Sequence, residues 1–137
     1  MLFAIDERDP QPIYLQLSMA VKNAVRTGEL QPGDALPSVR ELAGDLGVNL
    51  HTAHRAYQTL RDEGVVRLGL GRRARVAPRR ARKAGREEVR GRLSGVLEQL
   101  VTEAFHLGLT SRELKVLVEE FAGLRERSSR SRNHGHP

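Results

Sequence analysis

Two short helix signatures placed back to back, a hairpin signature behind them and two longer amphipathic runs predict a mainly α-helical fold with one small β-hairpin. The two short signatures meet at a Gly-Val break within residues 36–60, as the helices of a helix-turn-helix do. The hairpin signature at residues 65–76 adds a wing. The sequence therefore predicts a winged helix-turn-helix domain over residues 1–77, followed by a two-helix C-terminal dimerisation appendage.

The first predicted helix opens at Pro12 and ends at Gly28. Its apolar residues recur at helical spacing and form a single stripe: Leu17, Ala20, Val21, Ala24 and Val25. Pro32 and Gly33 then provide a turn before the next element. A helix with such a stripe can cover the two shorter helices that follow it.

The second predicted helix runs from Ser38 to Gly47. Ser38 and Glu41 have the spacing of a capping box, in which each side chain accepts a hydrogen bond from the backbone amide of the other residue. The apolar stripe of this helix consists of Val39, Leu42, Ala43 and Leu46. Gly47 ends the helix because glycine adopts the left-handed conformation without steric strain.

The third predicted helix begins after Asn49, whose side-chain oxygen can cap it, and ends near Gly64. Its inward stripe consists of Ala53, Ala56, Tyr57 and Leu60. The side chains left facing outward are Leu50, His51, His54, Arg55 and Gln58. Such a helix beside a supporting helix fits the major groove of B-DNA. An ordinary helical hairpin with a solvated outer face is the alternative.

Two short strands, 65–68 and 74–76, are predicted on either side of a Gly- and Arg-rich turn. The turn carries Gly71, Arg72 and Arg73 at its tip. Gly71 would let the backbone approach a groove closely, and the two arginines favour the negative potential of a minor groove. The hairpin is therefore predicted to be a DNA-contacting wing.

Several segments agree, in order, with a known family: PIYLQL, then GELQPGDALPSVRELAGDLGVN, then TAHRAYQTLRDEGVV, then the Gly-rich wing. Over residues 10–77 this order resembles the DNA-binding domain of GntR-type bacterial transcription regulators. The wing of those regulators usually carries a further glycine where this chain has Arg73 and an aromatic residue where it has Arg75. Residues 11–14 and 55–57 are most similar to the short-tailed YtrA-like branch of the family.

The resemblance implies which residues contact DNA. In complexes of GntR-type regulators, the arginine that matches Arg40 and the first turns of the recognition helix touch the duplex. The residues implied here are Arg40, Asn49, Leu50, His51, Thr52, His54 and Arg55. A leucine offers only apolar contact, for instance to a thymine methyl group, and the hydroxyl and amide of Thr52 suit a phosphate.

Three of these residues have structural alternatives. Asn49 is expected to cap its helix rather than to read a base. Arg40 and Arg55 could instead form ion pairs with Glu41 or Asp62.

Composition limits the function classes. The chain has 137 residues, 39% of them hydrophobic, which allows one domain with a modest core and a small appendage. Its net charge of +6 favours a polyanionic partner, double-stranded DNA first and an anionic membrane surface second. The absence of cysteine excludes disulfides. With no apolar run of membrane-spanning length and an acidic N-terminus unlike a secretion signal, a cytoplasmic protein without membrane contact is expected.

Catalytic and metal-binding patterns are missing from the sequence. There is no nucleophile with a partnered base, no GxxxxGK phosphate loop and no carboxylate pair in an apolar surround, so neither an enzyme nor a cofactor is expected. The pairs His51/His54 and His134/His136 each offer two ligands. Stable metal sites need three or four, so no metal is expected.

Basic residues crowd the wing and the segment that follows it. They are Arg67, Arg72, Arg73, Arg75, Arg79, Arg80, Arg82, Lys83, Arg86, Arg90 and Arg92. Residues 78–86 are predicted to form a basic linker between domains. Contact with DNA phosphates and simple solvation are the two interpretations of this charge.

Residues 87–127 are predicted to form two amphipathic helices that mediate dimerisation. The first ends near Gly108, and a second capping box at Thr110 and Glu113 opens the next. Their apolar stripes consist of Val89, Leu93, Val96, Leu97, Leu100, Val101 and Ala104, and of Leu114, Leu117, Val118, Phe121 and Leu124. Two helices cannot bury both stripes alone, which favours a two-fold homodimer over folding back onto the winged domain. Residues 128–137 are predicted to be a disordered tail.

These features together predict a sequence-specific, DNA-binding transcription regulator, a dimeric repressor that binds an inverted-repeat operator through the helix following Asn49 and the Arg-tipped wing. The first alternative is a non-specific architectural DNA-binding protein, and the second is a helical interaction module. A small-molecule effector, whose identity the sequence does not give, would be expected between the apolar helices after Glu87.

Overall fold

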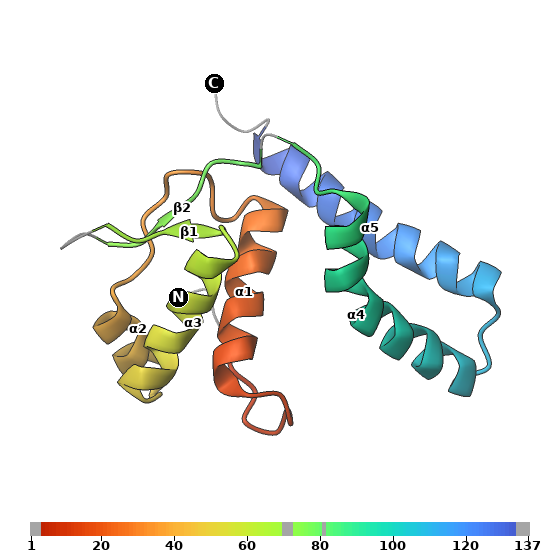
Figure 1. The fold of residues 1–137 in the computed structure, drawn as a ribbon, viewed down its shortest axis with the longest axis horizontal. Coiled ribbons are helices and arrows are strands. Elements are labelled where there is room, and N and C mark those ends of the chain that lie inside the picture. Colours follow the sequence, from red (N-terminus) through yellow and green to blue (C-terminus); the bar gives the residue numbers. More distant parts are fainter. Residues whose placement is uncertain (1–3, 70–72, 81, 134–137) are drawn as a thin grey trace. The chain divides into compact units, whose positions relative to one another are not determined.

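The computed structural model describes residues 4–69, 73–80 and 82–133 (Figure 1). Met1–Arg79 forms one compact unit, and Arg80–Arg127 forms another. The described part is mainly helical and holds a single two-stranded sheet, which confirms the predicted fold class.

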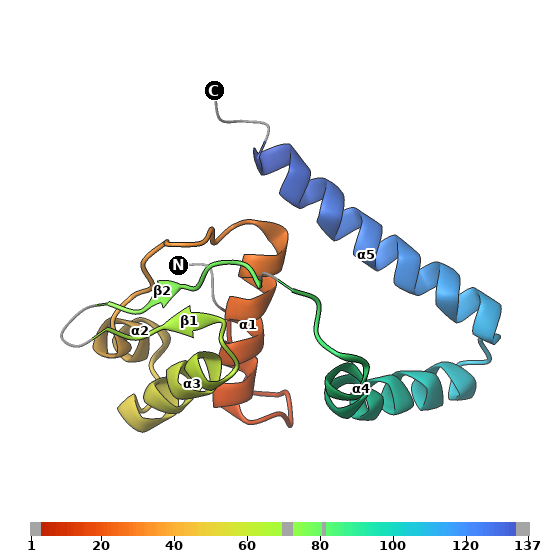
Figure 2. The same cartoon turned by 45° about the horizontal axis from the view of Figure 1, so that its top comes forward.

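The first unit contains three helices followed by a hairpin (Figures 1 and 2). The elements are α1 (Ile13–Thr27), α2 (Val39–Leu46), α3 (Leu50–Asp62), β1 (Val66–Arg67) and β2 (Arg75–Val76). This order is that of a winged helix-turn-helix, as predicted. Both strands are shorter than predicted, because only Val66 with Val76 and Arg67 with Arg75 stand opposite each other in the antiparallel pair.

The core of the first unit lies where α3 packs against α1 and α2. Its largest fully buried side chains are Leu17, Val21, Leu36, Leu42, Tyr57, Leu60 and Val66. Each such side chain contributes about 1.5–3 kcal/mol when it is taken out of water. The predicted inward stripes of the three helices supply most of them, so α3 is fixed in place with one face left to solvent.

The two ends of α2 differ in how well the sequence predicts them. Gly47 closes the helix with a left-handed φ of 66°, and the Ser38 Oγ accepts a hydrogen bond from the Glu41 amide at 3.1 Å. The reciprocal half of the predicted capping box is wrong, because the Glu41 Oε1 accepts instead from the Arg73 Nη2 at 2.7 Å. A bond between two charged groups is stronger than one from a neutral amide.

A segment that the sequence did not predict as a strand lies along the outer edge of β2. The backbone amides of Gly33 and Leu36 donate to the carbonyls of Val76 and Ala74, at 2.9 and 2.8 Å. The Val76 amide donates in return to the Asp34 carbonyl at 2.9 Å. The wing is therefore anchored to the loop between α1 and α2 as well as to its own other strand.

Two long helices follow the first unit, α4 (Arg86–His106) and α5 (Ser111–Asn133) (Figure 2). Gly108, with a φ of 81°, lies in the turn between them. The predicted capping box of α5 is confirmed and complete: the Glu113 amide donates to the Thr110 Oγ1 and the Thr110 amide donates to the Glu113 Oε1, each at 3.1 Å.

The C-terminal boundary of α5 differs from the expectation. The helix continues through Asn133, so the disordered tail predicted from Ser128 is wrong for residues 128–133. Once a helix is nucleated, each further residue adds a backbone hydrogen bond, which lets a polar sequence extend it. Residues 134–137 lie outside the described residues. Among the helices that the structure describes, none combines the length and apolarity needed to cross a bilayer.

Candidate DNA-binding surface

The solvent face of α3 carries the side chains that were predicted to face outward. Leu50 is 44% exposed, His51, His54 and Arg55 are exposed too, and Gln58 is half-buried. The opposite face packs into the core through Ala53, Ala56, Tyr57 and Leu60. The core therefore holds α3 rigidly, while its first two turns present a varied set of groups to a partner.

Asn49 caps the N-terminus of α3. Its Oδ1 accepts a hydrogen bond from the His51 amide at 2.8 Å, which confirms the predicted cap. Thr52 lies in the same first turn and is half-buried. The amides at a helix N-terminus favour negatively charged ligands, so this turn is suited to a phosphate oxygen or a base acceptor.

Arg40, in the first turn of α2, is exposed, and its guanidinium forms no hydrogen bond or ion pair with the residues that the structure describes. The carboxylates proposed as its alternative partners pair with other arginines. Glu41 pairs with Arg73, and Asp62 pairs with Arg61 at 3.2 Å. The structural alternative for Arg40 is therefore wrong, and its guanidinium is open to a ligand.

Arg55 has a partner that was not predicted. Its guanidinium carbon lies 3.9 Å from the centre of the Tyr14 ring, a cation–π contact between α3 and the start of α1. The alternative, an ion pair of Arg55 with Glu41 or Asp62, is wrong, because these carboxylates pair with Arg73 and Arg61. Tyr14 was not among the candidate site residues, since a tyrosine at the start of an amphipathic helix gives no signal of what it will contact.

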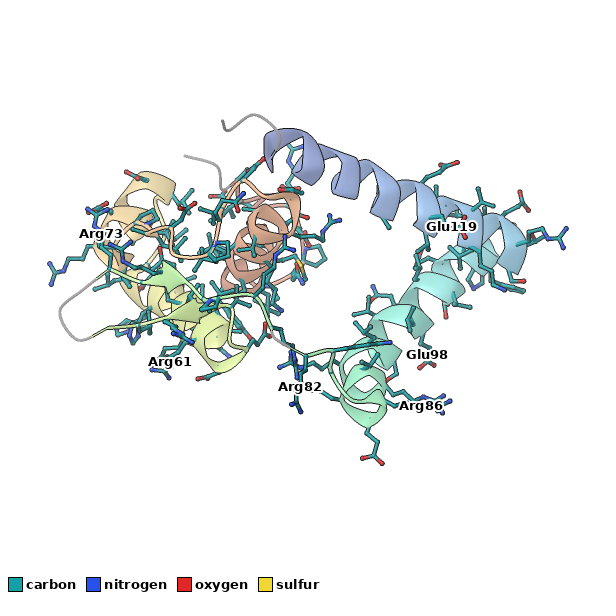
Figure 3. The ribbon with its side chains drawn as sticks, turned by 90° about the horizontal axis from the view of Figure 1, so that it is seen from above. Arg61, Arg73, Arg82, Arg86, Glu98 and Glu119 are labelled. Atoms are coloured by element: carbon teal, nitrogen blue, oxygen red, sulfur yellow. The ribbon has the colours of Figure 1, made fainter. Side chains whose placement is uncertain are left out.

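The wing is described only in part. Gly71 and Arg72, predicted at its tip, lie outside the described residues, and their roles stay predictions. Arg73 is described, and its side chain lies over α2, where it pairs with Glu41 at 2.7 Å (Figure 3). Both side chains remain about half exposed, at 55% and 48%. Arg73 is thus close to the helix-turn-helix rather than extended toward solvent.

The outer face of the wing is strongly basic. Arg67 and Arg75 stand opposite each other on β1 and β2, and both are exposed. Together with Arg73 they line a hollow of about 360 Å³. Part of this charge is used internally, because the Arg75 Nη1 donates to the Gly33 carbonyl at 2.8 Å. Like charges opposite each other on a hairpin are unfavourable unless an anion lies near them.

Tyr57 links α3 to the start of α2. It is buried, as predicted, and its hydroxyl donates to the Pro37 carbonyl at 2.6 Å. Burial, together with the negative charge of Glu41, raises the pKa of the hydroxyl well above its usual range. The bond therefore persists at every physiological pH, and it fixes how the two helices of the helix-turn-helix meet.

The basic segment after the wing contains one internal ion pair. Arg80 pairs with Glu88 in α4 at 2.9 Å, and this lowers the pKa of the Glu88 carboxyl. Arg79, Arg82 and Lys83 are exposed. The sequence predicted the charge but not that Arg80 is partly neutralised.

The helices α4 and α5 expose a large apolar surface. Exposed fractions are 53% for Leu97, 55% for Val101 and 47% for Val118. The other exposed apolar side chains of this surface are Leu93, Val96, Leu100, Phe105, Leu107, Leu117 and Phe121. A hollow of about 420 Å³ lies between the two helices and is lined mainly by leucines and valines. We call these residues the α4–α5 apolar face.

Metal-binding residues do not gather within the described part of the chain, where no group of three histidine or acidic side chains is positioned to hold an ion. His51 and His54 lie on the exposed face of α3. His134 and His136 lie outside the described residues.

Comparisons with known proteins agree with this geometry. Residues 13–76 match the model of the gntR family of bacterial regulatory proteins. The HTH-type transcriptional repressor YtrA of Bacillus subtilis (strain 168) is 32% identical over 124 residues, which span 88% of this chain and 92% of that protein. That likeness extends beyond the winged domain into the C-terminal helices.

Two solved structures are also similar. YtrA from Sulfolobus acidocaldarius, a GntR-family transcription factor, has 37% sequence identity and a TM-score of 0.58, covering 72% of this chain and 99% of its own. A transcriptional antiterminator from Listeria monocytogenes EGD-e has 27% identity and a TM-score of 0.78, covering 89% and 90%.

Proposed function

The chain belongs to the gntR family of bacterial regulatory proteins, and from that premise we propose that it represses transcription by binding an inverted-repeat operator as a homodimer. In this proposal α3 reads base edges in the major groove, and the wing contacts the adjacent backbone and minor groove. Residues 78–86 link the DNA-binding unit to the helices that join the two subunits.

The observation that carries the proposal is the solvent face of α3. Its side chains combine apolar, imidazole and guanidinium groups within two turns of a capped helix N-terminus. Such a face can discriminate base pairs, because each base pair presents a distinct pattern of donors, acceptors and methyl groups in the major groove. A surface used only for non-specific binding needs positive charge alone.

The α4–α5 apolar face supports the homodimer. Monomeric proteins rarely expose contiguous apolar surface on this scale, and a second copy of the same face can cover it through a two-fold axis. The same axis would place two copies of α3 in successive major grooves roughly 34 Å apart. The operator is therefore expected to be palindromic.

Selection of preferred duplexes from a random pool tests the proposal. We expect an inverted repeat, bound at least ~10³ times more tightly than scrambled DNA at physiological salt. A ratio near unity would instead indicate a non-specific architectural protein. No binding to any duplex would indicate a helical interaction module.

Two variants separate base reading from phosphate binding. His51→Ala should lower the ratio of operator to scrambled affinity, because it removes a group from the reading face. Arg79→Ala should weaken both affinities alike and flatten the dependence of log K on log salt by about 0.9, the value for one lost phosphate contact. Equal losses on both duplexes for His51→Ala would contradict its assignment to base reading.

A further inference from the structure

Tyr14 and Arg55 form a contact that the proposed function does not use. Tyr14 lies in the first turn of α1 and Arg55 in the second turn of α3, with the guanidinium carbon 3.9 Å from the ring centre. Tyr14 is half-buried, whereas Arg55 is exposed on the same face as His51 and His54. The core therefore holds the Tyr14 ring, and Arg55 lies on the solvent side of that ring.

The packing of α1 on α3 explains why these two side chains meet. Ser18, one turn after Tyr14, is buried between the helices, and its hydroxyl bonds to the Tyr14 carbonyl at 2.8 Å and lies 3.5 Å from the Ala56 carbonyl. Two small side chains at this crossing let the helices approach closely. The preceding turn of α1 is thereby placed beside Arg55, the neighbour of Ala56.

Stacking leaves the hydrogen-bonding groups of Arg55 unused. The face of a phenol ring carries no oxygen or nitrogen acceptor, so the ring beside the guanidinium carbon takes up none of the N–H donors of Arg55 in a conventional hydrogen bond. The guanidinium of Arg55 forms no hydrogen bond or ion pair with any residue that the structure describes, and only the Arg55 backbone carbonyl accepts a bond, from the Thr59 Oγ1 at 2.9 Å. Arg61, Arg73 and Arg80, in contrast, each pair with a carboxylate.

A stacked guanidinium is prepared for a flat, two-acceptor ligand. A free arginine loses much rotational freedom when it binds, and a side chain already held against a ring loses less. Guanine presents two such acceptors, O6 and N7, side by side in the major groove. A phosphate also accepts two bonds, but it reaches the protein from the groove edge and carries no base identity.

We propose, building on the function proposed above, that Tyr14 is a positioning residue that holds Arg55 in the orientation needed to read a guanine in each half-site. Specificity at that base pair then depends on a residue of α1 that itself touches no base. Removing the ring frees the guanidinium and weakens operator binding, whereas removing only the tyrosine hydroxyl leaves the stack intact.

The test uses the full chain and the operator obtained by selection. Tyr14→Phe is the matched control, because it keeps the ring, and Tyr14→Leu removes it. We expect Tyr14→Phe to bind the operator within about 2-fold of the unmodified chain. Tyr14→Leu should lose roughly 2- to 30-fold on the operator, the range of a cation–π contact, with little change on scrambled DNA. In an Arg55→Ala background, Tyr14→Leu should have no further effect on the operator.

A modified base tests the ligand directly. Guanines of the operator are replaced one at a time by 7-deazaguanine, which lacks the N7 acceptor. At one position per half-site, this replacement should weaken operator binding by the unmodified chain. It should leave operator binding by Arg55→Ala unchanged. Arg55→Lys should behave like Arg55→Ala on the operator, because it keeps the charge but not the planar pair of donors.

Three results would overturn the inference. Equal losses on operator and scrambled DNA for Tyr14→Leu would mean that Arg55 holds a phosphate. If Tyr14→Leu lowered operator affinity equally in the unmodified and the Arg55→Ala backgrounds, and also lowered the melting temperature, Tyr14 would only pack α1 against α3. An unchanged operator affinity would mean that the stack has no role in binding. If the unmodified chain itself prefers no duplex, the proposed function is wrong. That result differs from the three above, in which the unmodified chain still prefers its operator.

Discussion

If the wing contacts DNA as proposed, the Glu41 carboxylate and a DNA phosphate are alternative partners for Arg73. In the structure the guanidinium is bound to Glu41 at 2.7 Å, on the side of the wing that meets α2. This pair is half exposed, so it contributes little to stability in water. In the proposed complex, a phosphate approaching the wing would compete with a carboxylate that is already in place, and this competition would lower the affinity for every duplex alike.

Glu41→Gln tests this competition. The variant should bind operator and scrambled DNA more tightly by a similar factor, and the slope of log K against log salt should steepen by about 0.9, because one more arginine reaches a phosphate. Both affinities are measured by fluorescence anisotropy over a range of salt concentrations. In an Arg73→Ala background the change in slope should disappear. A slope that stays the same in Glu41→Gln would show that Arg73 does not reach DNA.

At this scale the sequence predicts residues whose partners are close in the chain. The cap from Asn49 to His51 spans two residues, and the outward face of α3 follows from helical spacing alone. Arg73 with Glu41, and Arg55 with Tyr14, lie far apart in the chain. Those partners are decided by how helices and wing pack together, and a single sequence contains no signal of that packing.

At the scale of elements, the two glycines of α2 differ in the backbone conformation that their positions require. Gly47 closes the helix at a φ of 66°, whereas Gly44 lies inside the helix, and an added methyl group would meet no atom within 4 Å at either position. Any difference between the two substitutions therefore comes from the backbone.

Gly47→Ala should lower the free energy of unfolding by about 1–2 kcal/mol, since the left-handed conformation strains any side chain. Gly44→Ala, its control in the same helix, should raise it by about 0.5–1 kcal/mol, because alanine restricts the unfolded chain. Urea denaturation measures both. Similar effects for the two variants would mean that the glycine is not required at the helix end.

The capping box of α5 gives a pH dependence. Hydrogen bonds from the amide and the hydroxyl of Thr110 lower the pKa of the Glu113 carboxyl from its ordinary value of 4.5. The contribution of this group to helix stability is therefore complete above pH 4.5 and is lost as the pH falls through the lowered pKa.

Carboxyl chemical shifts in NMR should place the Glu113 titration below the ordinary value of 4.5. Exchange of the Thr110 amide should accelerate over the same pH interval. In Glu113→Gln the acceleration should be absent, because the amide side chain does not titrate. A Glu113 titration at the ordinary pKa would contradict the bonding of its carboxylate to the Thr110 amide.

The elements differ in how far the sequence determines them. Helices with a clear apolar stripe and a cap, such as α1 and α3, are predicted closely. The segment at residues 33–36 that pairs with β2 is not predicted from the sequence. Its Pro-Gly turn has no strand pattern, and its pairing comes from tertiary structure. The end of α5 also differs, because a polar composition does not stop a helix that is already formed.

For the molecule as a whole, the proposed homodimer depends on the α4–α5 apolar face. Leu97 is 53% exposed and lines the hollow between the two helices. Helical spacing places Gln99 on the opposite side of α4, where it is exposed as well. Figure 3 shows Glu98 on α4 and Glu119 on α5, and Glu119 lines the same hollow as Leu97.

Leu97→Glu should raise the dimer dissociation constant at least about tenfold, because burying an unpaired carboxylate costs more than the roughly 1.4 kcal/mol that this factor represents. Gln99→Glu adds the same charge and should associate like the unmodified chain. Sedimentation equilibrium over a range of protein concentrations measures both. If Leu97→Glu remains dimeric, the subunits meet elsewhere and the helices are covered by their own chain.

The division of the chain between Arg79 and Arg80 has an evolutionary consequence. Under the proposed function, the residues that would read DNA and those that would join the subunits are encoded in different stretches of the gene, so a mutation in one stretch would leave the other unchanged. After a gene duplication, two descendants can first lose their ability to pair with each other and later diverge in the promoters they recognise. Such an architecture would let one ancestral regulator give rise to several that work side by side without mixing.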